Sequence, residues 1–272
     1  MPYFGDYLRQ IQLPLNIVSS RYRALPDFII VGAQRSGTTS LYRYLSEHPD
    51  VLPAIRKEIH YFDINYEKGV NWYRRHFPLR RHIDLLSKTR GVNVITGEAS
   101  PYYLYYSLAP DRIYSTVPNV KIIIMLRNPV DRAYSHYFHE KRLGKERFSF
   151  EDAIKNERER LLDNDDDFYH QHYSYLSRGK YVKQVKRYFE VFIRENVLII
   201  ESEDFFDDTV AAYSNVLDFL DVEKHSLNDV RAHYSLDYSE MEEGVRTELV
   251  EFFRPYNREL YRYLGRSFNW DK

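Results

Sequence analysis

Residues Pro26 to Leu41 read PDFIIVGAQRSGTTSL, and the spacing of apolar residues changes within this stretch. Phe28 to Val31 form a continuous apolar run, which is short enough for a buried parallel strand. After Thr38, apolar side chains recur at helical spacing, at Leu41, Tyr44 and Leu45. The stretch therefore predicts a strand, a glycine loop and a helix that ends near His48-Pro49.

The loop between this strand and helix has the size and composition of an anion-binding turn. Gly32 and Gly37 permit backbone conformations that turn N–H groups inward, and the following helix adds the positive end of its dipole. A nucleotide-hydrolysing P-loop has lysine directly after its second glycine, but Thr38 stands there. The one cation of the loop is Arg35. We expect an anionic group at this loop.

A second strand and helix, Lys121 to Leu126 and Pro129 to His139, supply another cation at a strand end. Arg127 follows the strand, and Ser135 lies about two helical turns further on, where both side chains can share one phosphate. Ligands of open α/β sheets bind at such carboxyl ends. We interpret Arg132 as structural.

The segment Arg56 to Asp63, RKEIHYFD, is too polar for a core strand. Lys57, Glu58 and His60 place a proton acceptor and cations within one turn of chain, as activation of a hydroxyl requires. A solvated charged loop is the other interpretation of the same residues.

Four motifs in this order resemble the heparan-sulfate type of sulfotransferase, which includes glucosaminyl N- and 3-O-sulfotransferases and many bacterial relatives. They are the Arg35 loop, K-E-I-H-Y-F-D with the later N-W-Y and F-P, Gly97 to Tyr103 (GEASPYY), and Lys121 to Ser135 (KIIIMLRNPVDRAYS). The resemblance spans Asp27 to Trp270. It implies an α/β fold with a central parallel sheet, a P-loop-like phosphosulfate loop, and helices on both faces.

The resemblance also implies a reaction. A sulfuryl group would pass by in-line displacement from 3'-phosphoadenosine 5'-phosphosulfate (PAPS) to a hydroxyl or amine, releasing adenosine 3',5'-bisphosphate (PAP), with no metal. Glu58 would be the catalytic base, with Arg35 and His60 as further catalytic residues. The nucleotide would be held by the glycine loop, by the family's 3'-phosphate motif, Lys121 to Ser135, and by its G-x-Y element, Gly179 to Tyr181. The residues implied are Arg35, Ser36, Gly37, Thr38, Thr39, Ser40, Arg127, Ser135 and Tyr181.

Composition limits the other functions. The chain has 272 residues, 43% of them hydrophobic, a formal charge of -1 and no cysteine. We therefore expect an arm over residues 1–25 and a single domain over 26–272, without the cationic excess of a nucleic-acid binder and without disulfides. No apolar run is long enough for a membrane span or a signal peptide, which favours a cytoplasmic protein.

Later segments are predicted from periodicity. We expect helices over Phe148 to Leu162, capped by Ser149, from Tyr181 to about Glu195, over Tyr213 to Leu220, and over Met241 to Tyr263, and a strand over Val197 to Ile200. His170 and His172 follow an acidic run, 163–167, which is a weak metal-site pattern and otherwise a surface loop near the acceptor. Family relatives place a basic lid where Arg231 and His233 stand, but this chain is less basic there.

Two functions of other classes stay open. A P-loop kinase would bind ATP with magnesium, although the loop lysine is missing. A non-catalytic module would bind PAP without turnover. Within the sulfotransferase interpretation, the acceptor can be a glycan, a small hydroxylated metabolite or a carrier-bound acyl chain. The basic stretch Arg74 to His82 suits an acidic acceptor.

Overall fold

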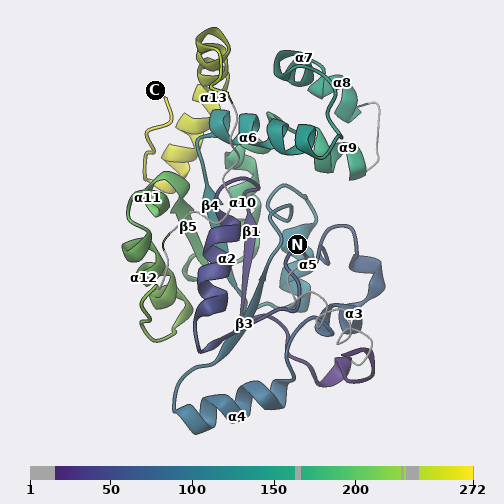
Figure 1. Ribbon diagram of the computed structural model, residues 1–272, viewed down its shortest axis with the longest axis vertical. Coiled ribbons are helices and arrows are strands. Elements are labelled where there is room, and N and C mark those ends of the chain that lie inside the picture. Colours follow the sequence, from purple (N-terminus) through teal and green to yellow (C-terminus); the bar gives the residue numbers. More distant parts are fainter. Residues whose placement is uncertain (1–15, 163–166, 228–229, 231–238, 272) are drawn as a thin grey trace.

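The computed structural model describes residues 16–162, 167–227, 230 and 239–271. A parallel five-stranded sheet in the order β2-β3-β1-β4-β5 forms its centre (Figure 1). Its strands are β1 (Phe28–Gly32), β2 (Val51–Pro53), β3 (Ile95–Ala99), β4 (Lys121–Leu126) and β5 (Val197–Glu201). The strand order reverses between β1 and β4, so their carboxyl ends flank the crevice where parallel α/β sheets bind ligands.

Alternating side chains of the two central strands feed two separate cores. Phe28 and Ile30 of β1 join Ile123 and Met125 of β4 on one face. Helices α2 (Thr38–Glu47), α11 (Ser202–Asp207) and α12 (Thr209–Leu220) cover that face. The predicted loop and helix are thus confirmed, and α2 begins directly after the loop, with Gly37 as its N-cap.

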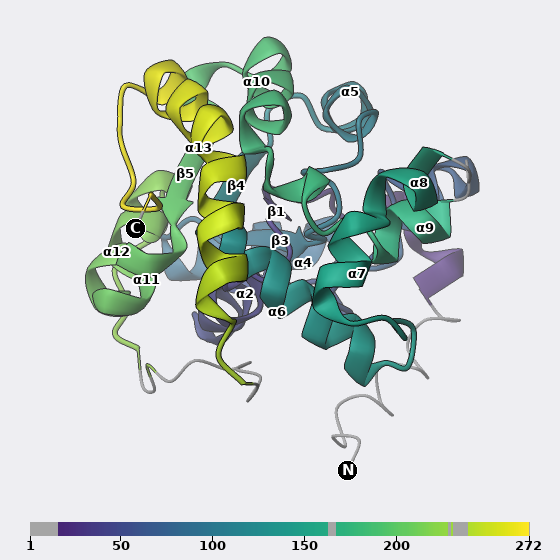
Figure 2. The same cartoon turned by 90° about the horizontal axis from the view of Figure 1, so that it is seen from above.

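The opposite face receives Ile29 and Val31 of β1 and Ile122 and Ile124 of β4. Helices α5 (Ala109–Thr116), α10 (Tyr181–Val191) and the end of α13 (Glu243–Leu264) cover it, and Figure 2 shows α13 along the outside. The class predicted from the sequence, a central parallel sheet with helices on both faces, is confirmed.

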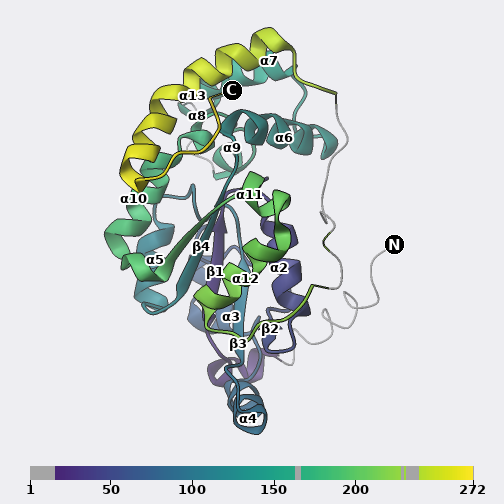
Figure 3. The ribbon, with the colours of Figure 1, turned by 90° about the vertical axis from the view of Figure 1, so that its left-hand side faces the viewer.

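A third core lies beyond the carboxyl edge of the sheet. Helix α6 (Pro129–Arg142) crosses this edge, and α7 (Phe150–Lys155) and the first half of α13 pack against it to form the core. Helices α8 (Glu157–Leu162) and α9 (Asp167–His172) follow α7 in the chain (Figure 3). At the other edge, α3 (Val70–Arg74) and the projecting α4 (Arg80–Arg90) follow the β2 connection. The short 3-10 turns are η1 (Ser20–Tyr22), η2 (Tyr66–Lys68), η3 (Ser177–Gly179) and η4 (Arg194–Asn196).

Three predicted helices have wrong bounds. The helix expected over Tyr213 to Leu220, α12, begins at Thr209, because the side chain of Asp208 caps it there and accepts from Ala211 N at 3.0 Å. The single helix expected over Phe148 to Leu162 is split at Asn156, the C-cap of α7, whose side-chain Nδ2 and backbone N both donate to the Asp152 carbonyl. Helix α10 ends at Val191 because Phe192 turns into an extended conformation and is buried. The Ser149 cap is confirmed, with its Oγ accepting from Asp152 N at 3.1 Å.

None of the described helices is both long enough and apolar enough to cross a bilayer.

Candidate active site

A pocket of about 350 Å³ lies where β1 and β4 end, at the crevice that the strand order defines. Most of the residues that the sequence assigned to catalysis or to the nucleotide line it. They are Arg35, Gly37, Thr38, Thr39, Ser40, Glu58 and Arg127. These seven residues come from three separate parts of the chain, which therefore meet at one cavity.

The glycine loop reaches the pocket through two left-handed backbone positions. Gly37 has φ +87 and is the N-cap of α2, and a Cβ there would lie 3.0 Å from the Phe206 ring. Arg35 has φ +69, a conformation that few non-glycine residues adopt. Ser36 is buried behind the loop, and no hydrogen-bond partner for its Oγ is found among the described residues. The loop is thus shaped to expose its backbone toward the pocket.

Arg127 and Arg35 line the pocket, and both are linked to neighbours by hydrogen bonds. The Arg127 guanidinium donates to the Arg35 carbonyl at 3.2 Å, and Arg35 Nε donates to Ser135 Oγ at 3.0 Å. Ser135 is buried and does not line the pocket. Tyr181 lies behind Arg127, since its hydroxyl donates to the Arg127 carbonyl at 2.9 Å. Tyr181 therefore holds the backbone of a pocket residue.

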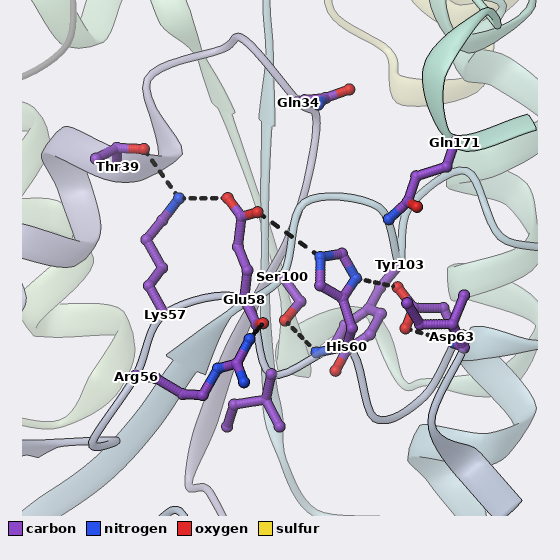
Figure 4. Close-up of polar contacts among 12 residues, drawn as sticks. Gln34, Thr39, Arg56, Lys57, Glu58, His60, Asp63, Ser100, Tyr103 and Gln171 are labelled. Carbon is purple, nitrogen blue, oxygen red and sulfur yellow. Dashed lines mark hydrogen bonds and ion pairs between the residues drawn. The ribbon is translucent and has the colours of Figure 1, made fainter. Parts of the chain in front are cut away.

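Glu58 is the carboxylate of the pocket, and it lies in a chain of charged side chains (Figure 4). Lys57 Nζ donates to Glu58 Oε1 at 2.8 Å and to Thr39 Oγ1 at 2.9 Å. His60 Nε2 lies 3.7 Å from Glu58 Oε2, and His60 Nδ1 lies 2.6 Å from Asp63 Oδ2. The carboxylate still keeps 46% of its side chain exposed.

This arrangement shifts two pKa values in opposite directions. Burial raises the pKa of Glu58, but the contact with His60 and the charge of Lys57 outweigh it and lower the pKa to about 2. Burial lowers the pKa of His60, but its contacts with Asp63 and Glu58 raise it to about 9. At neutral pH, Glu58 is therefore an anion and His60 an imidazolium that is held in place from both sides.

The backbone of this segment is held at the end of β3 in a rare conformation. Glu58 and His60 have φ of 57° and 56°. Glu58 N donates to the Ala99 carbonyl at 3.0 Å, and His60 N donates to Ser100 Oγ at 3.3 Å. Left-handed backbone at non-glycine residues costs energy and is typical of functional sites.

Several lining residues were not assigned from the sequence. Lys57 lines the pocket and Asp63 lies behind His60, and both stand in the segment Arg56 to Asp63. The sequence showed that these charged side chains were present, but it did not show that they contact Glu58 and His60. His139 and Phe206 also line the pocket, and nothing in the sequence distinguishes them from ordinary helix residues. No hydrogen-bond partner for the buried His139 Nδ1 is found within the described ranges.

The metal pattern at His170 and His172 is not supported by the part of the chain that the structure describes, which holds no cluster of metal-ligating side chains. His172 instead lies against the buried Glu140 of α6 at 2.9 Å. The acidic residues 163–166 and the lid residues Arg231 and His233 lie outside the described residues.

This chain is similar to proteins of known activity. Heparan sulfate glucosamine 3-O-sulfotransferase 3B1 of Mus musculus is 30% identical over 274 residues, covering 92% of this chain and 66% of the relative. The membrane-associated sulfotransferase kil1 of Dictyostelium discoideum is 25% identical over 329 residues, covering 93% of this chain and 68% of the relative. The chain thus spans about two thirds of the length of these curated relatives.

A solved structure and a family model complete the comparison. The crystal structure of a sulfotransferase from Alicyclobacillus acidocaldarius matches with a TM-score of 0.73 at 36% identity, covering 92% of this chain and 100% of that one. The model of the sulfotransferase domain matches residues 25–255. This chain therefore belongs to the sulfotransferase family of enzymes.

Proposed function

We propose that this sulfotransferase takes its sulfuryl group from PAPS and that Glu58 is the general base toward a hydroxyl or amine of the acceptor. The observation that carries the proposal is the position of the Glu58 carboxylate, half-exposed in the wall of a pocket that also presents Arg35, Lys57 and Arg127. A carboxylate that faces a cationic pocket can remove a proton beside a bound anion.

The residues of the pocket fit the donor. Three cations face one carboxylate, so the pocket favours a ligand with several negative charges. His139 Nδ1 has no hydrogen-bond partner among the described residues, so it offers the donor a further polar contact. Arg35 and the amides that open α2 would hold the phosphosulfate, and Arg127 with Ser135 would hold the 3'-phosphate. When bound, PAPS supplies the transferable sulfuryl group.

Lys57 connects the loop to the base. It bridges Thr39 and Glu58, so negative charge bound at the loop competes with Glu58 for the ammonium. Weaker contact with Lys57 raises the pKa of Glu58 and makes it a better proton acceptor. His60, positioned by Asp63, keeps the carboxylate oriented toward the pocket.

The acceptor is open among a glycan, a small hydroxylated metabolite and a carrier-bound acyl chain. The curated relatives named as heparan sulfate glucosamine 3-O-sulfotransferases favour a glycan.

The proposal is tested by Glu58→Gln, which keeps the size of the side chain but removes the proton acceptor. Transfer of the sulfuryl group from PAPS to an acceptor that the wild type modifies should fall ~10²-fold or more, while PAP affinity changes little. Mass spectrometry of the product measures transfer, and calorimetry measures PAP binding. Near-normal transfer by Glu58→Gln would sink the assignment, and a larger loss in His60→Ala would move the role of base to His60.

A further inference from the structure

Strand β3 carries a fully buried carboxylate, that of Glu98, which does not line the active-site pocket. Three hydroxyl groups donate to it, from Tyr73 to Oε1 at 2.6 Å, from Tyr103 to Oε1 at 3.2 Å and from Ser100 to Oε2 at 2.7 Å. A buried carboxylate is costly unless its oxygens are hydrogen-bonded, and this one is bonded by hydroxyls. The second contacts of these hydroxyls indicate what the carboxylate does.

Two of the three hydroxyls also accept hydrogen bonds from the segment that carries Glu58. Ser100 Oγ accepts from His60 N at 3.3 Å (Figure 4). The Tyr103 hydroxyl accepts from Tyr61 N at 2.7 Å. The buried carboxylate is thus separated by one hydroxyl from each of two backbone N–H groups of this segment.

The direction of these hydrogen bonds depends on the carboxylate. A hydroxyl has one proton to donate, so the partner that takes this proton decides where the lone pairs point. An ionised carboxylate can only accept, so it takes both protons and leaves the lone pairs of Ser100 and Tyr103 facing the N–H groups. The segment needs such support, because Glu58 and His60 hold left-handed backbone at φ of 57° and 56°.

The charge of Glu98 changes near neutral pH. Burial raises its pKa to about 7, and the charge of Asp63 acts in the same direction. The hydroxyls of Tyr73, Ser100 and Tyr103 act in the opposite direction, because they donate to the ionised form. At pH 8 the ionised form, which accepts hydrogen bonds at both oxygens, therefore predominates.

We propose that Glu98 is a positioning residue for sulfuryl transfer, which fixes the direction of two hydroxyls and so holds the segment Glu58 to His60 in its left-handed conformation. The inference rests on the proposed function, because the shape of this segment matters for transfer if Glu58 is the base. Glu98 acts through Ser100 and Tyr103 and does not itself reach the pocket.

Two tyrosine variants form a matched test. Tyr103→Phe and Tyr73→Phe each keep the ring and remove one hydroxyl that donates to Glu98 Oε1. The Tyr103 hydroxyl also accepts from Tyr61 N, whereas within the described ranges the Tyr73 hydroxyl is hydrogen-bonded to Glu98 alone. At pH 8, kcat for transfer from PAPS should fall ~10-fold in Tyr103→Phe and less than about twofold in Tyr73→Phe. PAP affinity, measured by calorimetry, should stay the same in both, and equal losses of kcat would overturn the proposal.

NMR titration of the His60 ring gives a second readout, which needs no turnover. Burial lowers the pKa of His60, but its contacts with Asp63 and Glu58 raise it to about 9. Relaxation of the segment weakens these contacts, so the pKa should fall toward 6.5 in Tyr103→Phe and stay near 9 in Tyr73→Phe. An unchanged pKa in Tyr103→Phe, or the same fall in both variants, would contradict the positioning role.

Glu98→Gln tests the carboxylate directly, because the amide places an N–H donor where an oxygen accepted. Its kcat at pH 8 should fall ~10-fold at unchanged PAP affinity. Ser100→Ala should lose a similar factor, and the double variant should lose less than the product of the two, because both changes act through one hydrogen bond. Near-normal kcat in Glu98→Gln, or full multiplication of the two losses, would remove Glu98 from the mechanism. If Glu98→Gln does not fold, the two tyrosine variants decide.

The inference and the proposed function fail separately. Near-normal transfer by Glu58→Gln would remove the proposed function, while the His60 titration would still show whether the hydroxyl network holds the segment. A large loss in Glu58→Gln together with equal losses in Tyr103→Phe and Tyr73→Phe would leave Glu58 as the base and overturn the role of Glu98.

Discussion

The Glu58 carboxylate illustrates how single contacts set reactivity at the residue scale. Lys57 donates to it at 2.8 Å and His60 lies 3.7 Å away, which lowers its pKa to about 2 although burial acts in the opposite direction. A carboxylate with so low a pKa is a weak base. The proposed mechanism therefore requires that the contact with Lys57 weaken when the donor binds.

We predict that Lys57→Met raises the pKa of Glu58, because it removes a charge and a hydrogen bond from the carboxylate. The expected shift is upward from about 2. NMR titration of the Glu58 side-chain carbon measures it. Lys88→Met on the projecting α4 is the control and should leave the titration unchanged. An unaltered titration in Lys57→Met would contradict the role given to Lys57.

A second residue-scale prediction concerns His60. Its pKa is raised from 6.5 to about 9 in the folded protein, so protonated His60 stabilises the fold fully below pH about 6.5, and this contribution is lost as the pH rises through about 9. The free energy of unfolding of the wild type should exceed that of His60→Gln by up to about 3 kcal/mol at low pH, with the gap closing above the folded pKa. Urea denaturation at a series of pH values measures this gap. A gap that is constant with pH would show that His60 is not an imidazolium.

At the element scale, α6 positions the expected phosphate contacts. Arg127 stands just before the helix and Ser135 lies within it. The Asn128 side chain caps the helix, since its Oδ1 accepts from Val130 N at 3.0 Å, and Pro129 begins it. The cap therefore fixes both the start of the helix and the place of Arg127.

We predict that Asn128→Ala lowers the free energy of unfolding by ~1 kcal/mol, the usual cost of an N-cap, and also weakens PAP binding. Ser149→Ala is a matched control, because it removes the cap of α7, which lies away from the pocket. It should lose similar stability but keep its PAP affinity. Urea denaturation and calorimetry measure the two quantities. If both variants bound PAP equally well, the cap would have no part in the site.

At the scale of the whole molecule, the order of the strands brings the site together. The loop after β1, the segment after β2, the turn after β3 and Arg127 after β4 all contribute to one pocket at the carboxyl ends of the parallel strands. A ligand that contacts several of these segments links them and stabilises the native state by mass action.

We predict that PAP without added metal raises the melting temperature of the protein. At about 100 times its dissociation constant, PAP should add ~2.7 kcal/mol, which corresponds to roughly 5–10 °C for a chain of this size. Arg127→Ala should lose most of the shift, and ATP with magnesium should give less than PAP. Differential scanning calorimetry measures it. Equal shifts in the wild type and in Arg127→Ala would refute the nucleotide assignment.

The sequence determined those parts of the molecule whose signals are local. The apolar runs of β1 and β4, the glycine loop and the cap of α7 are readable because strand burial, left-handed backbone and capping depend on neighbours in the chain. The motif around Glu58 also showed which acids and cations were available. It gave no distances between them.

Tertiary structure decided the rest. Strand β3 has no apolar run, because Thr96, Gly97 and Glu98 are buried at its centre. Glu98 is tolerated there since the hydroxyls of Tyr73 and Tyr103 donate to it, and those residues meet only in the fold. The pocket likewise needs Lys57, Glu58 and His139, which come from segments after different strands, because a sheet brings strand ends together whatever their distance along the chain.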